Sequence, residues 1–542
     1  MMLSHENDCG ARVPGSLVPR VWTICLDFSA TPVTLVIEGS GCRVEDVGGL
    51  QTVSWDNCGH WEPFIVLKGT EAYLTAIGGH VCPIYACHFG NTVRLSNVAS
   101  RLMQPHDALQ VDAFILLQNI TGIPYPQNNF FKDIQLLEAS GEYRLSALGM
   151  QRLRSVLEGA TIISQDAVLD MAIAKWDVHL SSGVDIAVLL SGGYDSRLNL
   201  AIACHAARRF GNRVHAFHEH KNTYEESIAI AVADAANVPL TIKKRDSFVG
   251  VNRSVIMDPS FVDLQSGFYR DNLIRWHHYL AHIHTILPGC LIMGMGAEAH
   301  KGKYYRKVES ISQDAPKIFG IDEVVVRAIS RKFGLIHADY QSQQVFFQAA
   351  VSHASSFMGH AAQVDFLHYQ TYVANGYGHR CHDVQQYFGM PFPLLENDFL
   401  SAVFALPRSE KEGFSLVTKG IQRLMPQLCH VAYTSANEKA LDSAPSFVRQ
   451  IKQSLIRMLG VRYFDWVSPK RKGRVGVSPV EFELLNRMQP SSPITALLIT
   501  EMTKGVRNTP FIRLDYLMQA CIYLNNLEKY KKVSLCLNSD LK

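Results

Sequence analysis

The chain has 542 residues, of which 19% are charged, and a formal net charge of +3. This balance excludes a strongly basic nucleic-acid coat and an acidic tail, so we expect no nucleic-acid partner and infer partners from individual sites. The length allows two or three domains, each with a core of its own.

Cysteine usage and the absence of targeting segments bear on the compartment. The 12 cysteines are scattered without a CxxC pair, which favours reduced thiols over a disulfide framework and gives no support for a zinc site. No basic-then-apolar signal opens the chain, and no apolar run reaches membrane-spanning length. We therefore expect a cytoplasmic protein with no membrane partner.

The first 150 residues show short apolar segments separated by turns. This pattern predicts strands at residues 22–28, 33–38, 72–77, 84–88 and 92–95. We expect an antiparallel, strand-rich domain over residues 1–150.

Two segments of this part carry a resemblance to a known family. They are GGHVCPIYACHFGNTVRLSNVASRL and TGIPYPQNNFFKDIQLLEASGEYRL, and they resemble the second half of the glutaminase domain of asparagine synthetases, an Ntn-hydrolase-like fold. That domain uses an N-terminal cysteine nucleophile, whereas this chain begins Met1-Met2-Leu3 and Cys9 is too far in to be exposed by methionine removal. We expect a degenerate glutaminase-like domain, active on glutamine only if the start is processed. The alternative is a domain that braces the next one or shapes its entrance.

A phosphate loop is predicted at SGGYDS, residues 191–196, because it joins a buried strand to a helix. The apolar run 186–190 has the length of a strand buried on both faces. Gly192 and Gly193 leave room for the backbone to close around an anion, and Ser191 and Ser196 offer hydroxyls. The first turn of the following helix favours negative charge. A triphosphate would fit this loop.

Asp195 is the unusual residue of the loop, since a carboxylate repels phosphate unless a divalent cation lies between them. We therefore expect Mg²⁺, and the lysine of a Walker-type loop is absent. The residues SGGYDS resemble the SGGxDS loop of the ATP pyrophosphatase superfamily, which cleaves ATP between its α and β phosphates. The resemblance implies that the loop holds the pyrophosphate of ATP. The alternative is a serine-glycine turn after a parallel strand.

Strand and helix signals alternate after the loop. Leu198, Ile202 and Ala206 recur at helical spacing until Gly211, strands are expected at 214–217 and 240–242, and a helix is expected at 225–236. This order predicts a parallel sheet with ligands at the carboxyl ends of its strands. By resemblance, the adenine is expected near the backbone of Leu189 and of Phe217.

A second loop follows a buried strand expected at 291–293. Its residues GMGAEAHKGKYY, 294–305, resemble without gaps the asparagine synthetase segment SGEGSDEVFGGY, whose acid after the glycines is a magnesium ligand. Glu298 falls on that acid, and Gly294 and Gly296 fall on two of the glycines. The resemblance implies that Asp195 and Glu298 hold one cation against the pyrophosphate.

Met295, between these glycines, departs from the family pattern. Asparagine synthetases have Glu there and β-lactam synthetases have Tyr, but a thioether cannot take a proton. Either His300 or Tyr304 substitutes, or the nucleophile arrives deprotonated. His278 and His282, at helical i, i+4 spacing, permit a metal pair, but without HExxH we expect them to be structural.

Two later segments complete the resemblance. GMPFPLLENDFLSAVFALP, residues 389–407, resembles the family's PFLD segment, with Glu396 and Asp398 flanking the position of its single Asp. SPKRKGRVGVSP, residues 468–479, resembles the family's lysine loop with one extra residue. Lys470 and Lys472 are therefore both candidates for the lysine that the resemblance gives a charge-stabilising catalytic role. The alternative is a basic surface loop.

The resemblance to the asparagine synthetase and β-lactam synthetase family extends from residue 72 to 479. It implies an α/β protein with a synthetase domain at 160–542, of adenine-nucleotide α-hydrolase-like fold with a parallel sheet and a helical C-terminal part. It also implies an ATP-dependent, AMP-forming carbon–nitrogen ligase that joins a small-molecule or peptide carboxylate to an amine. We expect a lactam-forming, peptide-cyclising or natural-product amide synthetase. Ammonia-dependent asparagine synthesis and a non-catalytic nucleotide-binding homologue are the alternatives.

Overall fold

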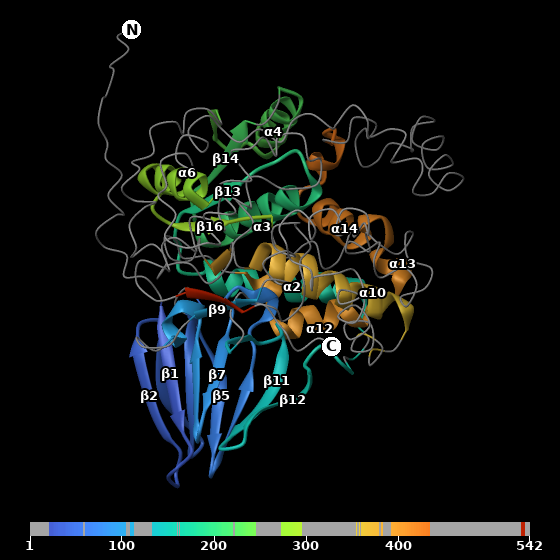
Figure 1. Ribbon diagram of the computed structural model, residues 1–542. Coiled ribbons are helices and arrows are strands. Elements are labelled where there is room, and N and C mark those ends of the chain that lie inside the picture. Colours follow the sequence, from blue (N-terminus) through green and yellow to red (C-terminus); the bar gives the residue numbers. More distant parts are fainter. Residues whose placement is uncertain are drawn as a thin grey trace, which may run out of the picture.

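The computed structural model describes residues 21–57, 60–103, 109–112, 133–159, 161, 163–220, 223–244, 273–294, 354, 357, 359–378, 381–382, 392–433 and 533–536. In these ranges the protein is mixed α/β, with antiparallel sheets in the N-terminal part and a parallel sheet among helices beyond it (Figure 1). None of the helices in these ranges is long and apolar enough to cross a membrane.

Two antiparallel sheets form the strand-rich N-terminal part. The five-stranded sheet has the order β10-β7-β8-β1-β2 and the six-stranded sheet the order β12-β11-β6-β5-β4-β3. Alternate side chains of both sheets enter one core, in which Trp22 lies 5.5 Å from Phe64 between ring centroids. The strands are β1 (Trp22–Asp27), β2 (Thr34–Gly39), β3 (Cys42–Val47), β4 (Leu50–Asn57), β5 (His60–Lys68), β6 (Glu71–Thr75), β7 (Tyr85–Phe89), β8 (Thr92–Ser96), β10 (Gln135–Leu136), β11 (Gly141–Ser146) and β12 (Gly149–Ser155).

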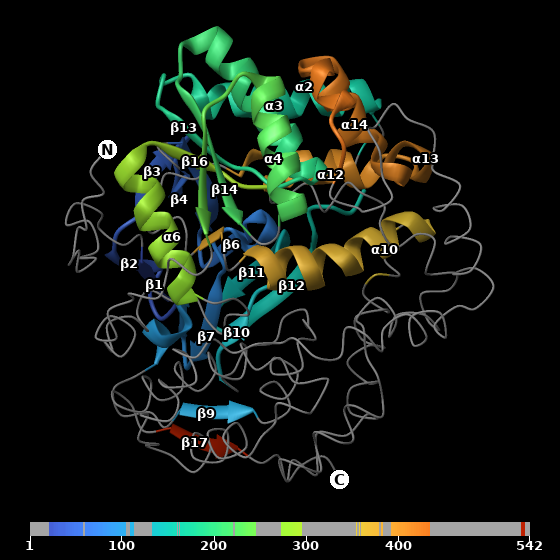
Figure 2. The same ribbon diagram turned by 90° about the horizontal axis from the view of Figure 1, so that it is seen from above.

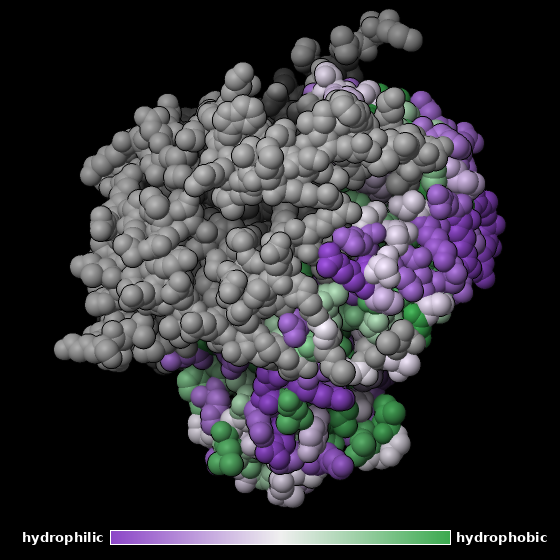
Figure 3. Space-filling model, turned by 90° about the vertical axis from the view of Figure 1, so that its right-hand side faces the viewer, coloured by the Kyte–Doolittle hydropathy of each residue, from purple (hydrophilic) through white to green (hydrophobic). Residues whose placement is uncertain are grey.

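The five strands predicted for this part are confirmed as β1, β2, β6, β7 and β8, with ends that differ by one or two residues. Strands β3, β4, β5, β10, β11 and β12 are additional. No side chain of β3 is fully buried, and a strand without a buried face needs little apolar alternation in its sequence. This strand was therefore not predicted. Figure 3 shows apolar and polar residues interspersed over the visible face of this part, and the most exposed apolar side chain is Leu148 at a hairpin turn.

The predicted parallel sheet is confirmed, with the order β15-β14-β13-β16. The central strand β13 (Ile186–Leu189) pairs with β14 (Val214–His220) on one side and with β16 (Cys290–Ile292) on the other, and β15 (Leu240–Lys244) is an edge strand. Because β13 and β16 are adjacent and parallel, their carboxyl ends open at the same edge of the sheet. The connecting helices are α3 (Tyr194–Phe210), α4 (Thr223–Ala236) and α6 (Leu273–Ile286).

Helices cover both faces of this sheet. Figure 2 shows α6 on one side and α3 and α4 on the other. The α3 face forms one core with α2 (Gln165–Leu180) and α14 (Ser415–Leu424), whereas the α6 face joins the core of the strand-rich part. In α14, a Cβ added to Gly420 would lie 2.8 Å from a methyl of Leu198, so the absence of a side chain lets α14 approach α3 closely.

The strand-rich part docks against the helices through buried hydrogen bonds. The Tyr369 hydroxyl accepts from the backbone N of Gly79 at 2.5 Å and lies 2.8 Å from the Ser140 hydroxyl. A Cβ on Gly78 would lie 1.9 Å from the carbonyl oxygen of Leu395, so only glycine allows this approach. The remaining elements are η1 (Gly78–His80), η2 (Ala99–Leu102), α10 (His360–His368), the π-helical η6 (Tyr369–Gly378), η7 (Pro393–Leu395), α12 (Asn397–Ala405), α13 (Arg408–Lys411), η8 (Glu412–Phe414), η9 (Pro426–His430) and the parallel pair β9 (Leu109–Asp112) and β17 (Val533–Cys536).

Candidate nucleotide site at the ends of β13 and β16

Two serines close the loop between β13 and α3. The Ser196 hydroxyl accepts from the backbone N of Ser191 and donates to its carbonyl oxygen, both at 3.0 Å. The Ser191 hydroxyl lies 2.9 Å from that of Ser196 and accepts from the backbone N of Gly193 at 3.2 Å. The hydroxyls that we predicted as phosphate donors therefore hold the loop in shape.

The helix that follows the loop begins without a side-chain cap. Its N-cap is Gly193, and no side chain bonds to the first turn in the manner of a cap. The helix runs for 17 residues to the left-handed C-cap Gly211, so its dipole places positive potential at the loop. This arrangement suits an anion bound by backbone N–H groups.

The start of the second predicted loop lies directly against the first. A Cβ built on Gly294 would lie 3.3 Å from the backbone N of Ser196 and 3.4 Å from the Cβ of Asp195. The side-chain amide of Asn199 donates to the carbonyl oxygen of Met293 at 2.6 Å, which fixes the end of β16 to α3. The structure thus places Gly294 close to Asp195.

The region predicted for the adenine lies between the ends of β13 and β14. Leu189 pairs with Phe217, and the Phe217 carbonyl accepts from the backbone N of Leu190 at 2.8 Å. The buried ring of His218 lies with Nδ1 2.9 Å from the Leu190 carbonyl oxygen. Its Nε2 has no hydrogen-bond partner among the residues that the structure describes. If Nδ1 carries the proton, Nε2 is an acceptor at this edge of the sheet.

Arg197 is a feature of the site that the sequence analysis did not predict. This fully buried guanidinium donates to the carbonyl oxygens of Leu428 at 2.9 Å, Val431 at 2.8 Å and Ala432 at 2.8 Å. Burial lowers the pKa of Arg197 below its usual value, and no described carboxylate pairs with it. The Arg197 side chain therefore holds segment 428–432 beside the loop by binding the backbone carbonyls of that segment.

An aromatic stack reinforces this anchor. The ring of Tyr194, the variable residue of the SGGYDS loop, lies between Phe414 at 4.9 Å and Tyr433 at 3.8 Å. Arg197 sits over the Tyr433 ring at 3.9 Å, and the hydroxyl of Tyr224 donates to the Tyr433 carbonyl at 3.0 Å. The stack ties the loop, α4 and the segment after α14 into one unit.

The predicted acids of the PFLD-like segment lie apart from the loop, in an ion cluster between α2 and α12. Glu396 and Asp398 both bind the ammonium of Lys175, and His179 lies 3.0 Å from Glu396. Burial lowers the pKa of Lys175, but its hydrogen bonds to Asp398 and Glu396 outweigh this effect and raise it. Burial likewise raises the pKa of Glu396, but hydrogen bonds from His179 and Lys175 lower it overall. Both shifts favour the charged forms of Lys175 and Glu396.

Several predicted residues lie outside the described ranges. They are Met295, Gly296, Glu298, His300, Tyr304, Lys470 and Lys472, together with the side chain of His278. Within those ranges, no three His, Cys, Asp or Glu side chains gather in a position to hold a metal ion. The carboxylate of Asp195 is nonetheless a donor of the kind that Mg²⁺ prefers, and Mg²⁺ commonly uses one or two carboxylates together with phosphate oxygens.

No protein-family model matches the chain, and no curated protein matches it. The loop, Asp195 and the nearby Gly294 are therefore the features that bear on function.

Proposed function

We propose that the protein is an ATP-dependent, AMP-forming carbon–nitrogen ligase that activates a carboxylate as an acyl-adenylate and transfers it to an amine. The observation that carries the proposal is the close approach of Gly294 to Asp195 and Ser196 at the shared edge of β13 and β16, where a Cβ on Gly294 would lie 3.3–3.4 Å from them. It joins the SGGYDS loop to the start of the GMGAE segment, the two parts of the chain that most resemble the asparagine synthetase and β-lactam synthetase family. In keeping with this, we infer a degenerate glutaminase-like, Ntn-hydrolase-like N-terminal domain and an adenine-nucleotide α-hydrolase-like synthetase domain.

Asp195 is the proposed magnesium ligand within the described ranges, and Glu298 is the proposed second one. Glu298 follows Gly294 by four residues, a span of at most about 14 Å when fully extended. Since Gly294 lies close to Asp195, this length is compatible with two carboxylates sharing one ion. Bound Mg²⁺ would neutralise charge on the phosphate oxygens.

The remaining roles belong to the loop and to the C-terminal lysines. The uncapped first turn of α3 offers backbone N–H groups to the phosphates, and the serines keep the loop in shape. Gly294 has no side chain, which leaves space in front of Asp195. We propose that Lys470 or Lys472 stabilises negative charge during adenylation.

We propose an organic amine or ammonia as the nucleophile that displaces AMP from the acyl-adenylate. Met295 cannot act as a base, so the amine arrives neutral or loses its proton to another group. A lactam-forming, peptide-cyclising or natural-product amide synthetase fits this departure from the family pattern.

The decisive experiment is ATP–pyrophosphate exchange, screened with a panel of carboxylates and peptides. We expect exchange with one class of carboxylate and a loss of at least about 100-fold in Asp195→Ala, because an uncompensated phosphate charge then opposes binding and reaction. Asp185→Ala is the matched control, since Asp185 precedes β13 at its other end and binds Arg213. Unchanged exchange in Asp195→Ala would refute the proposed metal site.

Two product assays separate the alternatives. Incubation with aspartate, ammonia and ATP yields AMP and asparagine if the protein is an ammonia-dependent asparagine synthetase. A non-catalytic homologue binds ATP in a titration but forms no AMP with any mixture of carboxylate and amine.

A further inference from the structure

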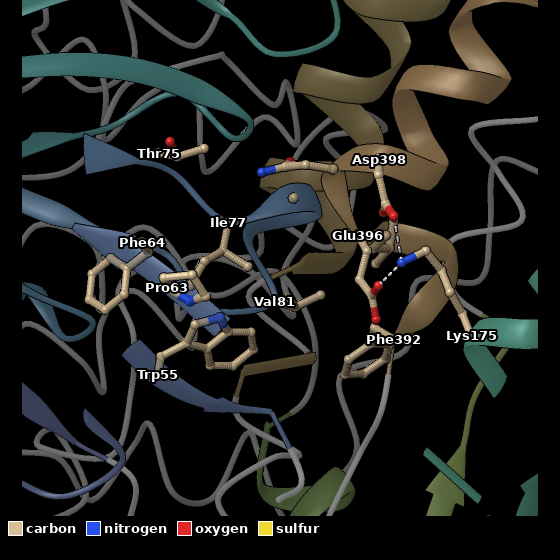
Figure 4. Close-up of a pocket in the computed structure, with 13 residues that line it drawn as sticks. Trp55, Pro63, Phe64, Thr75, Ile77, Val81, Lys175, Phe392, Glu396 and Asp398 are labelled. Atoms are coloured by element: carbon tan, nitrogen blue, oxygen red, sulfur yellow. Dashed lines mark hydrogen bonds and ion pairs between the residues drawn. The ribbon is translucent and has the colours of Figure 1, made fainter. Parts of the chain in front are cut away.

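A cavity of about 350 Å³ lies between the strand-rich part and the helices, and it shares no residue with the phosphate loop. Its size and its place between two structural units are typical of small-molecule sites. One wall comes from β4, β5 and η1, and the opposite wall from α2, η7 and the start of α12 (Figure 4).

The cavity has a largely apolar lining and one charged end. Aromatic and aliphatic side chains make up most of the lining: Trp55, Pro63, Phe64, Ile77, Val81, Phe392 and Leu395. The opposite end carries Lys175 between the carboxylates of Glu396 and Asp398, as Figure 4 shows. A ligand that fills the cavity therefore needs an apolar body and a polar head.

The charge balance selects the sign of that head. Lys175 is the only basic residue among the 13 lining residues, and both acidic ones bind it, which leaves one net negative charge. The Asp398 side chain is 64% exposed, whereas that of Glu396 is 16% exposed, so Asp398 is the more accessible acceptor. An anionic head would meet this carboxylate, but a cationic head would bind it.

We propose that this cavity binds an amphipathic organic amine, with its aromatic or aliphatic body between Phe64, Ile77 and Phe392 and its ammonium group at Asp398. The ion cluster alone accounts for the link between α2 and α12, but it does not account for the open apolar space beside it. The proposal does not depend on the nucleotide site.

Calorimetric titration of the full chain at pH 8 tests the inference, with 2-phenylethylamine as the probe and 3-phenylpropionate as an anion of similar size. At this pH the amine still carries its charge. We expect the amine to bind and the carboxylate to bind at least about tenfold more weakly, since it faces a like charge. Equal or tighter binding of 3-phenylpropionate, or no binding of the amine, would overturn the proposal.

Two variants locate the binding site. Asp398→Asn should weaken amine binding by roughly tenfold, because a charge-assisted hydrogen bond becomes a neutral one. Asp170→Asn is the matched control: its carboxylate is 60% exposed and paired with Arg423 but is not part of the cavity. Val81→Phe should abolish binding by filling the cavity, with thermal unfolding used to verify the fold of each variant. Loss in Asp170→Asn equal to that in Asp398→Asn, or unchanged binding in Asp398→Asn, would refute the site.

Discussion

The phosphate loop and the Lys175 cluster are held together in opposite ways. At the loop, a buried cation, Arg197, is satisfied by three backbone carbonyl oxygens. At the junction of α2 and α12, Lys175 is satisfied by two carboxylates. The first arrangement keeps its positive charge close to the proposed phosphate site, whereas in the second the two carboxylates outnumber the lysine. A guanidinium charge without a carboxylate partner among the described residues, such as that of Arg197, favours polyphosphate binding. An ion-paired ammonium such as that of Lys175 suits a junction between two helices.

Replacement of Arg197 tests the first half of this comparison most severely. Arg197→Met should lower the free energy of unfolding by about 3–5 kcal/mol, because three buried carbonyls lose their donors. Urea unfolding measures the effect. Arg209→Met, on the same helix but half-exposed and paired with Asp177, should change stability little. Equal effects of the two variants would show that the carbonyl anchor has no special role.

Two glycines at opposite ends of β16 separate stability from site geometry. A Cβ on Gly289 would lie 2.2 Å from the Asp185 carbonyl oxygen, so Gly289→Ala should cost about 2–3 kcal/mol through forced backbone shifts. Gly294→Ala meets Ser196 and Asp195 at 3.3–3.4 Å and should cost about 1 kcal/mol or less. ATP–pyrophosphate exchange, measured on the folded fraction of each variant, should show the opposite ranking, with a larger loss of rate in Gly294→Ala than in Gly289→Ala. The proposed site would be contradicted if Gly294→Ala retained full exchange.

Removal of the lysine tests the second half of the comparison. Lys175→Met should cost about 1–2 kcal/mol, less than Arg197→Met, because Glu396 keeps His179 as a partner and Asp398 is largely exposed. Lys419→Met, which breaks a more exposed pair with Asp166, is the control and should have a smaller effect. Chemical denaturation of Lys175→Met, Lys419→Met and Arg197→Met, each compared with the wild type, measures these differences in the free energy of unfolding.

The smallest expected effect is a pH dependence. The folded-state pKa of Glu396 is below its unfolded value, so its ionised form stabilises the fold. This contribution is fully present above about pH 4.3, the ordinary pKa of Glu, and is lost as the pH falls through the folded pKa. The stability difference between the wild type and Glu396→Gln should therefore be constant near neutral pH and shrink in acid. The shrinkage should be weaker in a Lys175→Met background.

Local patterns predicted the parts of the fold that depend on local sequence. The order β13, loop, α3, β14, α4, β15 follows from apolar runs, glycines and helical spacing within 60 residues, and the structure confirms it. This order of elements needs no knowledge of distant contacts. The sharing of one cation by Asp195 and Glu298 stays a prediction, which rests on the rule that parallel strands open at one edge.

Features assembled from distant residues could not be predicted in this way. Arg197 meets Leu428 at a separation of 231 residues, and Lys175 meets Glu396 at 221. Neither pair shows a periodicity or a motif, and the cavity is lined from five separate stretches of chain. The strands β3, β4 and β5 were missed for a related reason: their pairing with each other, rather than strong apolar alternation, defines them.

The use of carbonyl oxygens by Arg197 has an evolutionary consequence. Main-chain acceptors are the same whichever side chains stand at 428, 431 and 432, so point replacements there leave the anchor intact. Insertion or deletion of one residue, in contrast, would move every acceptor out of reach. Among related proteins the anchor itself should constrain the length of this stretch rather than its side chains, although the buried Leu428 and Cys429 must stay apolar for the core, and an arginine at the position of Arg197 should accompany that length.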